Sequence, residues 1–270
     1  MPSEAFYPKA SPRKPRNRRP APDPLDDRCA LFLDVDGTLL ELSSAPDRVS
    51  VDPEIGHLLL SLAAALDGAV ALITGRSIGD VDRLFGHSEL PVAGLHGSER
   101  RSIDGSIHRH EIAAAELTRL RNELARFAAR HKGLLFEDKG VAFAIHYRRV
   151  PALASLVHRT LRRHIGHPSD VGWHLQRGKG ILEIRPEGRD KGVAIADYLR
   201  EPPFAGRSPV FVGDDLSDEF GFDAVTALGG RAVKVGPGPT NAMYRLRDVA
   251  DVRRWLAESL AGKKGNGAVA

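Results

Sequence analysis

The sequence has almost no cysteine and no long apolar run, and each absence excludes a class of protein. Its 270 residues include a single cysteine, Cys29, so an intramolecular disulfide or a cysteine-rich zinc site is excluded. The longest apolar stretch runs from Leu58 to Leu66, is interrupted by Ser61, and is far shorter than the roughly 18–20 residues that cross a bilayer. We therefore expect no membrane partner.

A strong excess of one charge is also missing. There are 39 Lys and Arg residues against 35 Asp and Glu residues, a net charge of +4. So small an excess is not typical of a nucleic-acid-binding protein, and we expect no nucleic-acid partner. No apolar segment follows the basic N-terminus as in a secretory signal, and with the lone cysteine this favours a cytoplasmic protein.

The two ends of the chain differ in composition from the rest. Residues 1–27 hold six basic residues, four acidic residues and seven prolines, with few apolar side chains. This composition predicts a disordered, basic, proline-rich tail over residues 1–27, which we expect to be solvated. A second, shorter disordered tail is predicted over residues 263–270.

Between the tails, strand-like and helical patterns alternate. Short apolar runs typical of buried strands lie at residues 30–33, 69–73, 91–94, 209–212 and 231–235. Helical patterns lie at residues 53–66, 192–200, 218–228 and 252–260. The alternation predicts an α/β fold with a Rossmann-like parallel sheet that is covered by helices on both faces.

The middle of the chain follows another pattern. It begins with an Asp-Gly turn that predicts a tight hairpin at residues 103–107. Helices are then predicted near residues 112–131 and 151–164, and strands near residues 134–137, 141–146, 173–176 and 181–184. Hairpins with two helices predict an α+β insertion. We therefore expect a discontinuous core at residues 28–107 and 186–262, with a cap domain inserted at residues 108–185.

Two aspartates directly follow the first apolar run, in the string Asp-Val-Asp-Gly-Thr at residues 34–38. Ligands of open α/β sheets bind at the carboxyl ends of strands, so Asp34 and Asp36 would project into that crevice. Asp34 is ionised at neutral pH and could act as an oxygen nucleophile. Crowding of like charges would raise the pKa of Asp36, which could then protonate a poor leaving group such as a sugar alkoxide.

Three further motifs are predicted to reach the same crevice. Thr74 ends the second strand, where its hydroxyl and the following N–H groups could hold phosphate oxygens. Lys191 begins a helix, where a cation and helix N–H groups favour an anion. Residues 213–219 contain four acids in six positions, whose repulsion a hard cation such as Mg²⁺ would relieve. Each motif alone is compatible with a turn, an exposed lysine or a solvated acidic loop, whereas the ordered set favours one shared site.

This ordered set resembles the four motifs of the haloacid dehalogenase superfamily of phosphotransferases. The residues that carry the resemblance are Asp34, Asp36, Thr74, Lys191, Asp214 and Asp218. The resemblance implies that Asp34 is the nucleophile and forms an aspartyl-phosphate. It implies that Asp36 is the general acid in the first step and the general base in the second.

The resemblance also implies a metal site and a phosphate site. Mg²⁺ would be bound by Asp34, Asp214 and the backbone carbonyl of Asp36. The transferring phosphoryl group would be bound by Thr74, Gly75 and Lys191. Asp218 would order Lys191 or a water on the metal, and Asp215 would lie behind the metal ligands.

Further segments narrow the resemblance to trehalose-6-phosphate phosphatases. Residues 213–219 are similar to their extended Gly-Asp-Asp-x-Thr-Asp-Glu string, with Ser217 in place of threonine, and residues 94–100 resemble their Gly-x-His-Gly-x-Glu segment. Similar cap segments lie at residues 137–140, 146–148 and 178–186. The substrate-binding residues implied by this likeness are His96, Glu99, Glu137, Lys139, Arg148, Lys179 and Glu183.

The narrower resemblance implies Mg²⁺-dependent hydrolysis of trehalose 6-phosphate to trehalose and phosphate, in trehalose biosynthesis. A trehalose-6-phosphate synthase would be the pathway neighbour, and the cap would provide substrate specificity. The alternatives are a phosphatase of sucrose, mannosylglycerate or hexose phosphate, and a phosphomutase with the same core chemistry. A nucleic-acid-binding protein that uses the basic tail is a further alternative, although every catalytic position is filled.

Overall fold

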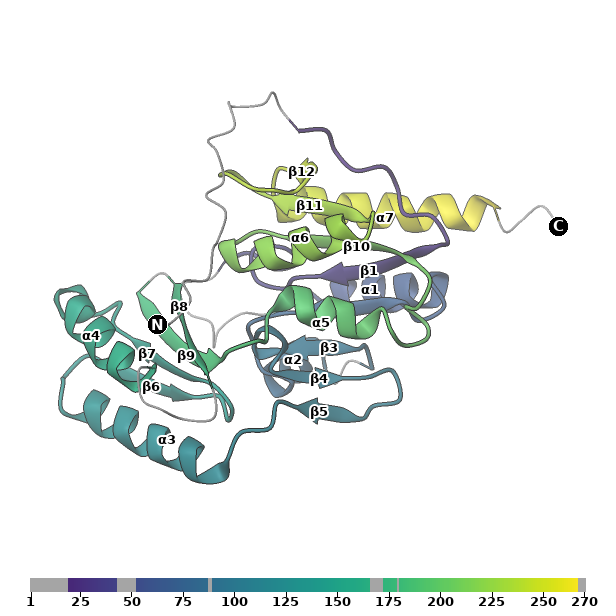
Figure 1. Cartoon of the computed structure of the whole chain (residues 1–270). Coiled ribbons are helices and arrows are strands. Elements are labelled where there is room, and N and C mark those ends of the chain that lie inside the picture. The colour runs from purple at the N-terminus through teal and green to yellow at the C-terminus, as the bar shows by residue number, and fades with distance from the viewer. Residues whose placement is uncertain (1–18, 43–51, 87–88, 166–171, 179, 267–270) are drawn as a thin grey trace, which may run out of the picture.

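The computed structural model describes residues 19–42, 52–86, 89–165, 172–178 and 180–266, and its largest element is an eight-stranded sheet (Figure 1). Its strand order is β12-β11-β10-β1-β2-β3-β4-β5. The strands are β1 (Cys29–Leu33), β2 (Val70–Ile73), β3 (Val92–Gly94), β4 (Glu99–Arg101), β5 (Ile107–Arg109), β10 (Ser208–Gly213), β11 (Arg231–Val235) and β12 (Tyr244–Leu246). From β12 to β3 all neighbours are parallel, and β4 and β5 add antiparallel at one edge.

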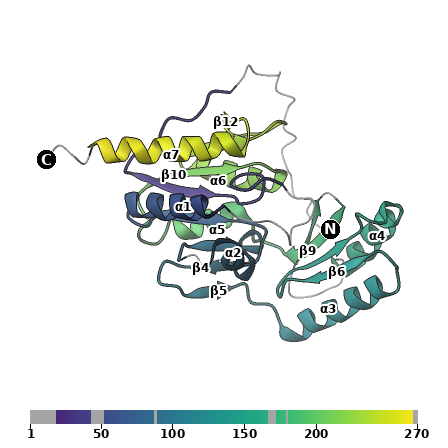
Figure 2. The ribbon, with the colours of Figure 1, turned by 180° about the vertical axis from the view of Figure 1, so that it is seen from behind.

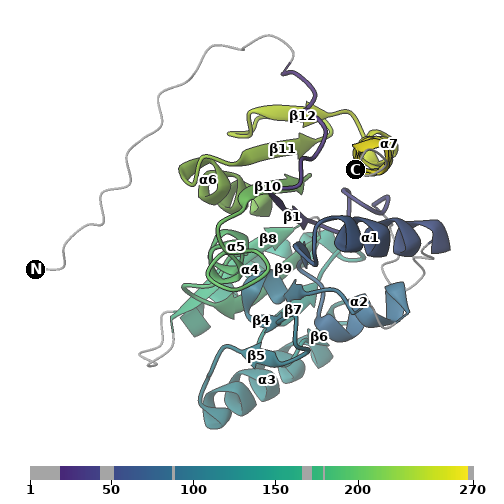
Figure 3. The same ribbon diagram turned by 90° about the vertical axis from the view of Figure 1, so that its right-hand side faces the viewer.

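Helices cover both faces of this sheet, which confirms the predicted α/β class. Figure 3 shows α1 (Pro53–Ala65), α2 (Ile78–Phe85) and α7 (Val249–Asn266) on one side, with α5 (Lys191–Tyr198) and α6 (Glu219–Ala227) on the other. Every residue of β1 and β2 is buried, as expected for apolar runs between two helical layers. Two elements, α2 and β12, have no counterpart in the sequence prediction.

A second, four-stranded antiparallel sheet lies beside the first (Figure 2). Its order is β6-β7-β9-β8, with strands β6 (Leu135–Asp138), β7 (Phe143–His146), β8 (Trp173–Gly178) and β9 (Ile181–Pro186). Helices α3 (Ala114–Ala129) and α4 (Ala154–Ile165) pack on one face, around a hydrophobic core that includes Leu124, Phe143 and Leu182. We call residues 110–186, which contain this sheet and its two helices, the four-stranded unit.

The ends of the elements differ from the sequence prediction by a few residues. The predicted boundary after residue 107 falls inside β5, which ends at Arg109, and the predicted boundary after residue 185 falls inside β9. Both strands continue because they pair with neighbours in their sheets, Glu99 with Arg109 and Trp173 with Pro186.

The tails are also shorter than predicted. The side chain of Leu25 is buried, and its N–H donates to Ser259 Oγ at 3.1 Å. The carbonyl of Pro20 accepts a hydrogen bond from the N–H of Arg245 at 3.0 Å. Residues 19–27 therefore pack against the core, because one apolar side chain and several backbone groups find partners there. At the other end α7 extends to Asn266, past the predicted start of the second tail at residue 263. The rest of the predicted tails, residues 1–18 and 267–270, lies outside the described residues.

None of the helices in the described part of the chain combines the length and the apolar character that crossing a bilayer requires.

Candidate active site

Parallel pairing of β1 with β10 brings two acidic loops to one edge of the large sheet. Leu33 lies opposite Val212, and the N–H of Asp34 donates to the carbonyl of Val212 at 3.0 Å. Asp34 and Asp214 therefore leave the sheet side by side. The chain turns sharply at Gly37, which has a φ of +84° and on which a Cβ would lie 2.2 Å from Asp214 Oδ2. Glycine is required there by both the backbone and the carboxylate that packs on it.

A buried lysine joins two of the carboxylates. Lys191 Nζ donates to Asp34 Oδ1 at 2.7 Å and to Asp218 Oδ1 at 2.6 Å, and all three residues are buried. Asp215 begins the turn that holds Asp218, since its N–H donates to Asp218 Oδ2 at 2.9 Å. Lys191 is the first residue of α5, and Asp218 directly precedes α6. These two helices pack against each other.

The acidic groups are crowded, and their pKa values reflect this. Burial, followed by the charges of Asp218 and Asp215, raises the pKa of Asp214 to about 6. Burial also raises the pKa of Asp34 well above its usual value, although Lys191 opposes the shift. Burial alone would lower the pKa of Lys191, but the charges of Asp218 and Asp34 outweigh it and raise that pKa. Lys191 is therefore a cation at neutral pH. Its single positive charge cannot balance three ionised carboxylates.

The donor set fits a hard divalent cation. Oxygen atoms of Asp34, Asp214 and Asp218 lie within 4.8 Å of one another. Three carboxylates and one ammonium group leave two excess negative charges when all are ionised. Asp214 Oδ1 is buried and has no hydrogen-bond partner among the described residues. An oxygen-rich cluster with two excess negative charges is typical of Mg²⁺ or Ca²⁺ sites.

The side chain of Asp36 turns to a different partner, Arg76. Arg76 Nε donates to Asp36 Oδ2 and Arg76 Nη2 donates to Asp36 Oδ1, both at 2.6 Å. Asp36 lies on the loop after β1, whereas Arg76 lies on the loop after β2. The second loop also contains Thr74, whose buried hydroxyl accepts from the N–H of Arg76 at 3.1 Å. Gly75 packs closely here, because a Cβ would lie 2.6 Å from His96 Nε2.

Strand alternation aims polar side chains of the four-stranded unit away from its helices. Leu182 and Ile184 of β9 enter the apolar core, so Glu183 lies on the opposite face. The register places Glu137, Ala144, Glu183 and Gln176 in one row across the sheet. Lys139 Nζ donates to Glu183 Oε2 at 2.9 Å, while Glu183 Oε1 is buried without a hydrogen-bond partner in the described chain.

His96 connects this face to the large sheet. Its Nε2 lies 3.2 Å from Nε2 of Gln176, and its backbone adopts the left-handed region with φ +54°. Burial, followed by the charges of Lys191 and Arg185, lowers the pKa of His96 well below its usual value, so the imidazole is neutral. His96 therefore lies where the two sheets meet.

The other predicted binding residues have different surroundings. Glu99 Oε1 accepts from the N–H of Ile78 at 2.6 Å and Glu99 Oε2 pairs with Arg109 at 3.5 Å, so this carboxylate supports the start of α2. Glu137 Oε2 lies 2.7 Å from His146 Nε2. Arg148 is exposed, and Lys179 lies outside the described residues.

Sequence reasoning missed three polar residues of this region. They are Arg76, Gln176 and Arg185, whose Nε donates to Gln176 Oε1 at 2.9 Å. Arg76 follows Thr74 and Gly75 directly, so its position after a strand end was a usable signal. Gln176 and Arg185 became recognisable only through the strand register.

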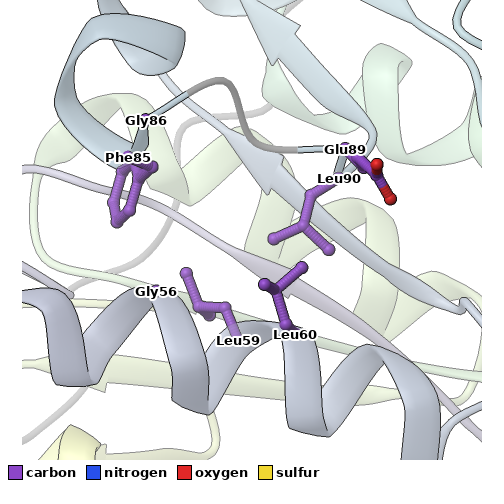
Figure 4. A pocket seen from close by; sticks show the side chains of 7 residues that line it. All are labelled: Gly56, Leu59, Leu60, Phe85, Gly86, Glu89 and Leu90. Atoms are coloured by element: carbon purple, nitrogen blue, oxygen red, sulfur yellow. The ribbon is translucent and has the colours of Figure 1, made fainter.

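A cavity of about 270 Å³ lies elsewhere, between α1 and the residues Phe85 and Leu90 (Figure 4). Leu59 and Leu60 of α1 point into it. None of the carboxylates or lysines described above lines this cavity.

A family model and two similar sequences point to one family. The family model for trehalose-phosphatases matches residues 32–250. Trehalose-6-phosphate phosphatase of Escherichia coli (strain K12) is 44% identical over 236 residues, which cover 86% of each chain. A probable trehalose-phosphate phosphatase of Sinorhizobium fredii is 42% identical over 241 residues, which cover 87% of this chain and 88% of the relative.

Solved structures resemble the fold. A trehalose-6-phosphate phosphatase related protein superposes with a TM-score of 0.70 at 25% identity, covering 87% of this chain and 99% of the other. The C-terminal domain of Candida albicans trehalose-6-phosphate phosphatase has a TM-score of 0.73 at 20% identity, covering 91% and 99%. This second likeness concerns the fold alone.

Proposed function

The chain belongs to the trehalose-phosphatase family, and from this premise we propose that it hydrolyses trehalose 6-phosphate to trehalose and phosphate, with Mg²⁺ and through an aspartyl-phosphate on Asp34. The protein is a phosphoric monoester hydrolase. The observation that carries the proposal is the convergence of Asp34, Lys191, Asp214 and Asp218 at one edge of the parallel sheet.

The first step transfers the phosphoryl group to Asp34. A carboxylate oxygen of Asp34 forms a bond to phosphorus while the bond from phosphorus to the sugar oxygen breaks. Asp36 gives its proton to that sugar oxygen, so trehalose leaves as an alcohol. Thr74, the N–H of Gly75 and Lys191 hold the phosphoryl oxygens during the transfer.

The second step releases phosphate and restores Asp34. Asp36, now a carboxylate, accepts a proton from water as the water oxygen bonds to phosphorus and the bond to Asp34 breaks. Mg²⁺ held by Asp34, Asp214 and the backbone carbonyl of Asp36 would supply positive charge that offsets the repulsion between carboxylate and phosphate. Asp218 keeps Lys191 in place at 2.6 Å, with Asp215 holding Asp218 in turn.

The four-stranded unit acts as the cap that recognises the sugar. Glu183 Oε1 lacks a partner in the described chain, and Lys139 and Glu137 lie on the same face, so donors and acceptors for several hydroxyls are at hand. Arg148 and Lys179 are assigned to sugar binding by the family resemblance, as are His96 and Glu99, which here serve at the junction of the sheets and at α2.

We further place the reaction in the cytoplasm, after a trehalose-6-phosphate synthase that supplies the substrate. The single cysteine, which is free and buried, suits a reducing compartment.

The test is incubation of the purified protein with trehalose 6-phosphate, with and without EDTA, and measurement of both phosphate and trehalose. We expect equal amounts of the two products and no turnover with EDTA. Asp34→Asn, which keeps size and shape, should fold normally and be inactive. Faster phosphate release from sucrose 6-phosphate or glucose 6-phosphate would overturn the substrate assignment, and an active Asp34→Asn variant would overturn the mechanism.

A further inference from the structure

The contact between Asp36 and Arg76 occupies both oxygens of the carboxylate that the proposed mechanism uses as an acid and base. The two hydrogen bonds are 2.6 Å long and come from different nitrogens of one guanidinium group. Such paired hydrogen bonds to arginine are strong and fix the plane of the carboxylate. While they last, the orientation of the Asp36 carboxylate is set by Arg76 and not by a leaving group.

Only the side chain of Arg76 is free to change partners. Its N–H donates to Thr74 Oγ1 at 3.1 Å, and its carbonyl accepts from the N–H of Leu95 at 2.9 Å, so the backbone is held at both ends. The Arg76 side chain is mostly buried but that of Asp36 is 32% exposed, so the pair is partly open to solvent.

The polar row of the four-stranded unit lies near the loop that contains Arg76. Gly75, next to Arg76, packs against His96, and His96 Nε2 lies 3.2 Å from Nε2 of Gln176 in that row. The same row contains Glu137 and Glu183. The loop that holds Arg76 therefore meets the polar face of the four-stranded unit through His96.

We propose that Arg76 is a latch that holds Asp36 until a substrate bound against the polar row of the four-stranded unit draws the guanidinium away from Asp36. This inference rests on the proposed function of the site. Arg76 is a positioning residue, since it acts through Asp36. A phosphate ester too small to contact the four-stranded unit leaves Asp36 bound to Arg76. Such an ester is then hydrolysed only if its leaving group needs no proton. The latch thereby makes proton donation conditional on the correct sugar.

The experiment compares Arg76→Gln and Arg76→Lys with the wild type on glucose 6-phosphate and p-nitrophenyl phosphate. Both are too small to fill the four-stranded unit, but only the glucose alkoxide needs a proton to leave. Since kcat/KM reports the steps up to phosphoryl transfer, its ratio between the two esters measures proton donation. In Arg76→Gln we expect the ratio of glucose to aryl ester to rise about tenfold or more, part of the roughly 10²–10⁴-fold that a positioned acid supplies. Arg76→Lys should raise it less, because one ammonium still attracts Asp36 without engaging both oxygens.

The matched control is Arg83→Gln, which removes an exposed arginine of α2 that pairs with Asp80. Its ratio should equal that of the wild type, and thermal unfolding checks that all variants fold. An unchanged or lower ratio in both Arg76 variants would overturn the latch, because a merely structural or phosphate-binding arginine lowers both rates together. If the ratio rises but the wild type does not hydrolyse trehalose 6-phosphate, the latch stands and the proposed substrate is wrong.

Discussion

Two buried lysine–carboxylate clusters, one in each unit, differ in a single respect that sets what each can bind. Lys191 in the core meets Asp34 and Asp218, with Asp214 close by, whereas Lys139 in the four-stranded unit is paired with Glu183. With every group ionised, the core cluster carries two excess negative charges and the pair of Lys139 and Glu183 is neutral. Each also contains a buried carboxylate oxygen without a hydrogen-bond partner in the described chain, Asp214 Oδ1 and Glu183 Oε1.

This difference in charge explains a difference in ligands. An unbalanced buried charge is costly, so the core cluster favours a divalent cation that neutralises it. A balanced pair has no need of a counter-ion, but its spare oxygen gains from a hydroxyl donor. In the proposed mechanism, the same residue types therefore support phosphoryl transfer in one unit and recognition of a neutral sugar in the other.

Removing the core lysine should have the largest effect. Lys191→Met leaves two buried carboxylates without their cation, which typically costs about 3–5 kcal/mol of unfolding free energy. Turnover should disappear as well. Urea unfolding in EDTA measures the free energy of unfolding. The matched variant is Lys139→Met, which leaves one buried carboxylate without its cation instead of two. Its loss of unfolding free energy should therefore be smaller. Equal losses in the two variants would contradict the comparison.

Metal removal should separate the two clusters next. A ligand at 100 times its Kd adds about 2.7 kcal/mol of stability, so Mg²⁺ should raise the melting temperature by roughly 5–10 °C. Asp214→Asn removes one charge from the core cluster and should reduce this shift, whereas Lys139→Met should keep it in full. Thermal unfolding with and without Mg²⁺ tests both. If Lys139→Met abolished the rise in melting temperature caused by Mg²⁺, the metal would bind in the four-stranded unit and not at the core cluster.

The neutral cluster should govern sugar recognition. Glu183→Gln removes the charge and replaces one of the two acceptor oxygens by an NH₂ group at nearly constant size, so Lys139 loses its counter-ion. We expect kcat/KM to fall at least about tenfold more for trehalose 6-phosphate than for p-nitrophenyl phosphate, equivalent to about 1.4 kcal/mol of selective binding.

The control for that experiment is Arg121→Gln, which breaks an exposed ion pair with Asp138 on the same unit. Exposed pairs contribute about 0–1 kcal/mol, so this variant should match the wild type in both assays. Equal losses on the sugar and aryl esters in Glu183→Gln would mean that the four-stranded unit does not recognise the sugar.

The last prediction concerns the pH dependence of stability and His96, where the units meet. Burial lowers the pKa of His96 well below its usual value, so the unfolded chain protonates this group and the folded chain does not. Stability should therefore be lost as the pH falls below about 6.5, by up to about 1.4 kcal/mol per pH unit. Unfolding free energies between pH 7.5 and pH 5 should fall less steeply in His96→Asn, which tolerates the left-handed backbone. His110, His158 and His174, whose pKa values are also lowered, contribute equally to both proteins. Parallel pH curves would contradict the assignment.

Much of the core could be predicted from the sequence because its signals are local. Apolar runs marked β1, β2, β3, β10 and β11, and parallel strands must end at a common edge. The acids after β1 and β10 were therefore expected to meet. Short elements such as α2 and β12 were missed, since eight and three residues carry little periodicity.

The direction of individual side chains was less accessible. Asp36 and Asp34 were expected to share one crevice, but the carboxylate of Asp36 pairs with Arg76. Glu99 matched a binding motif, yet both its oxygens support α2 and β5. In each case the carboxylate binds a partner on another element of the fold. Spacing along the sequence does not give the distance in space between two such residues.

By itself the sequence determined where strands end and which charged groups stand at those ends, because burial of apolar runs is a local property of the chain. Only the tertiary structure decided which charges balance. Lys191 and Asp34 are 157 positions apart, and Lys139 and Glu183 are 44 apart. Electrostatic energy depends on distance in space, so the −2 charge of one cluster and the neutrality of the other exist only once the chain has folded.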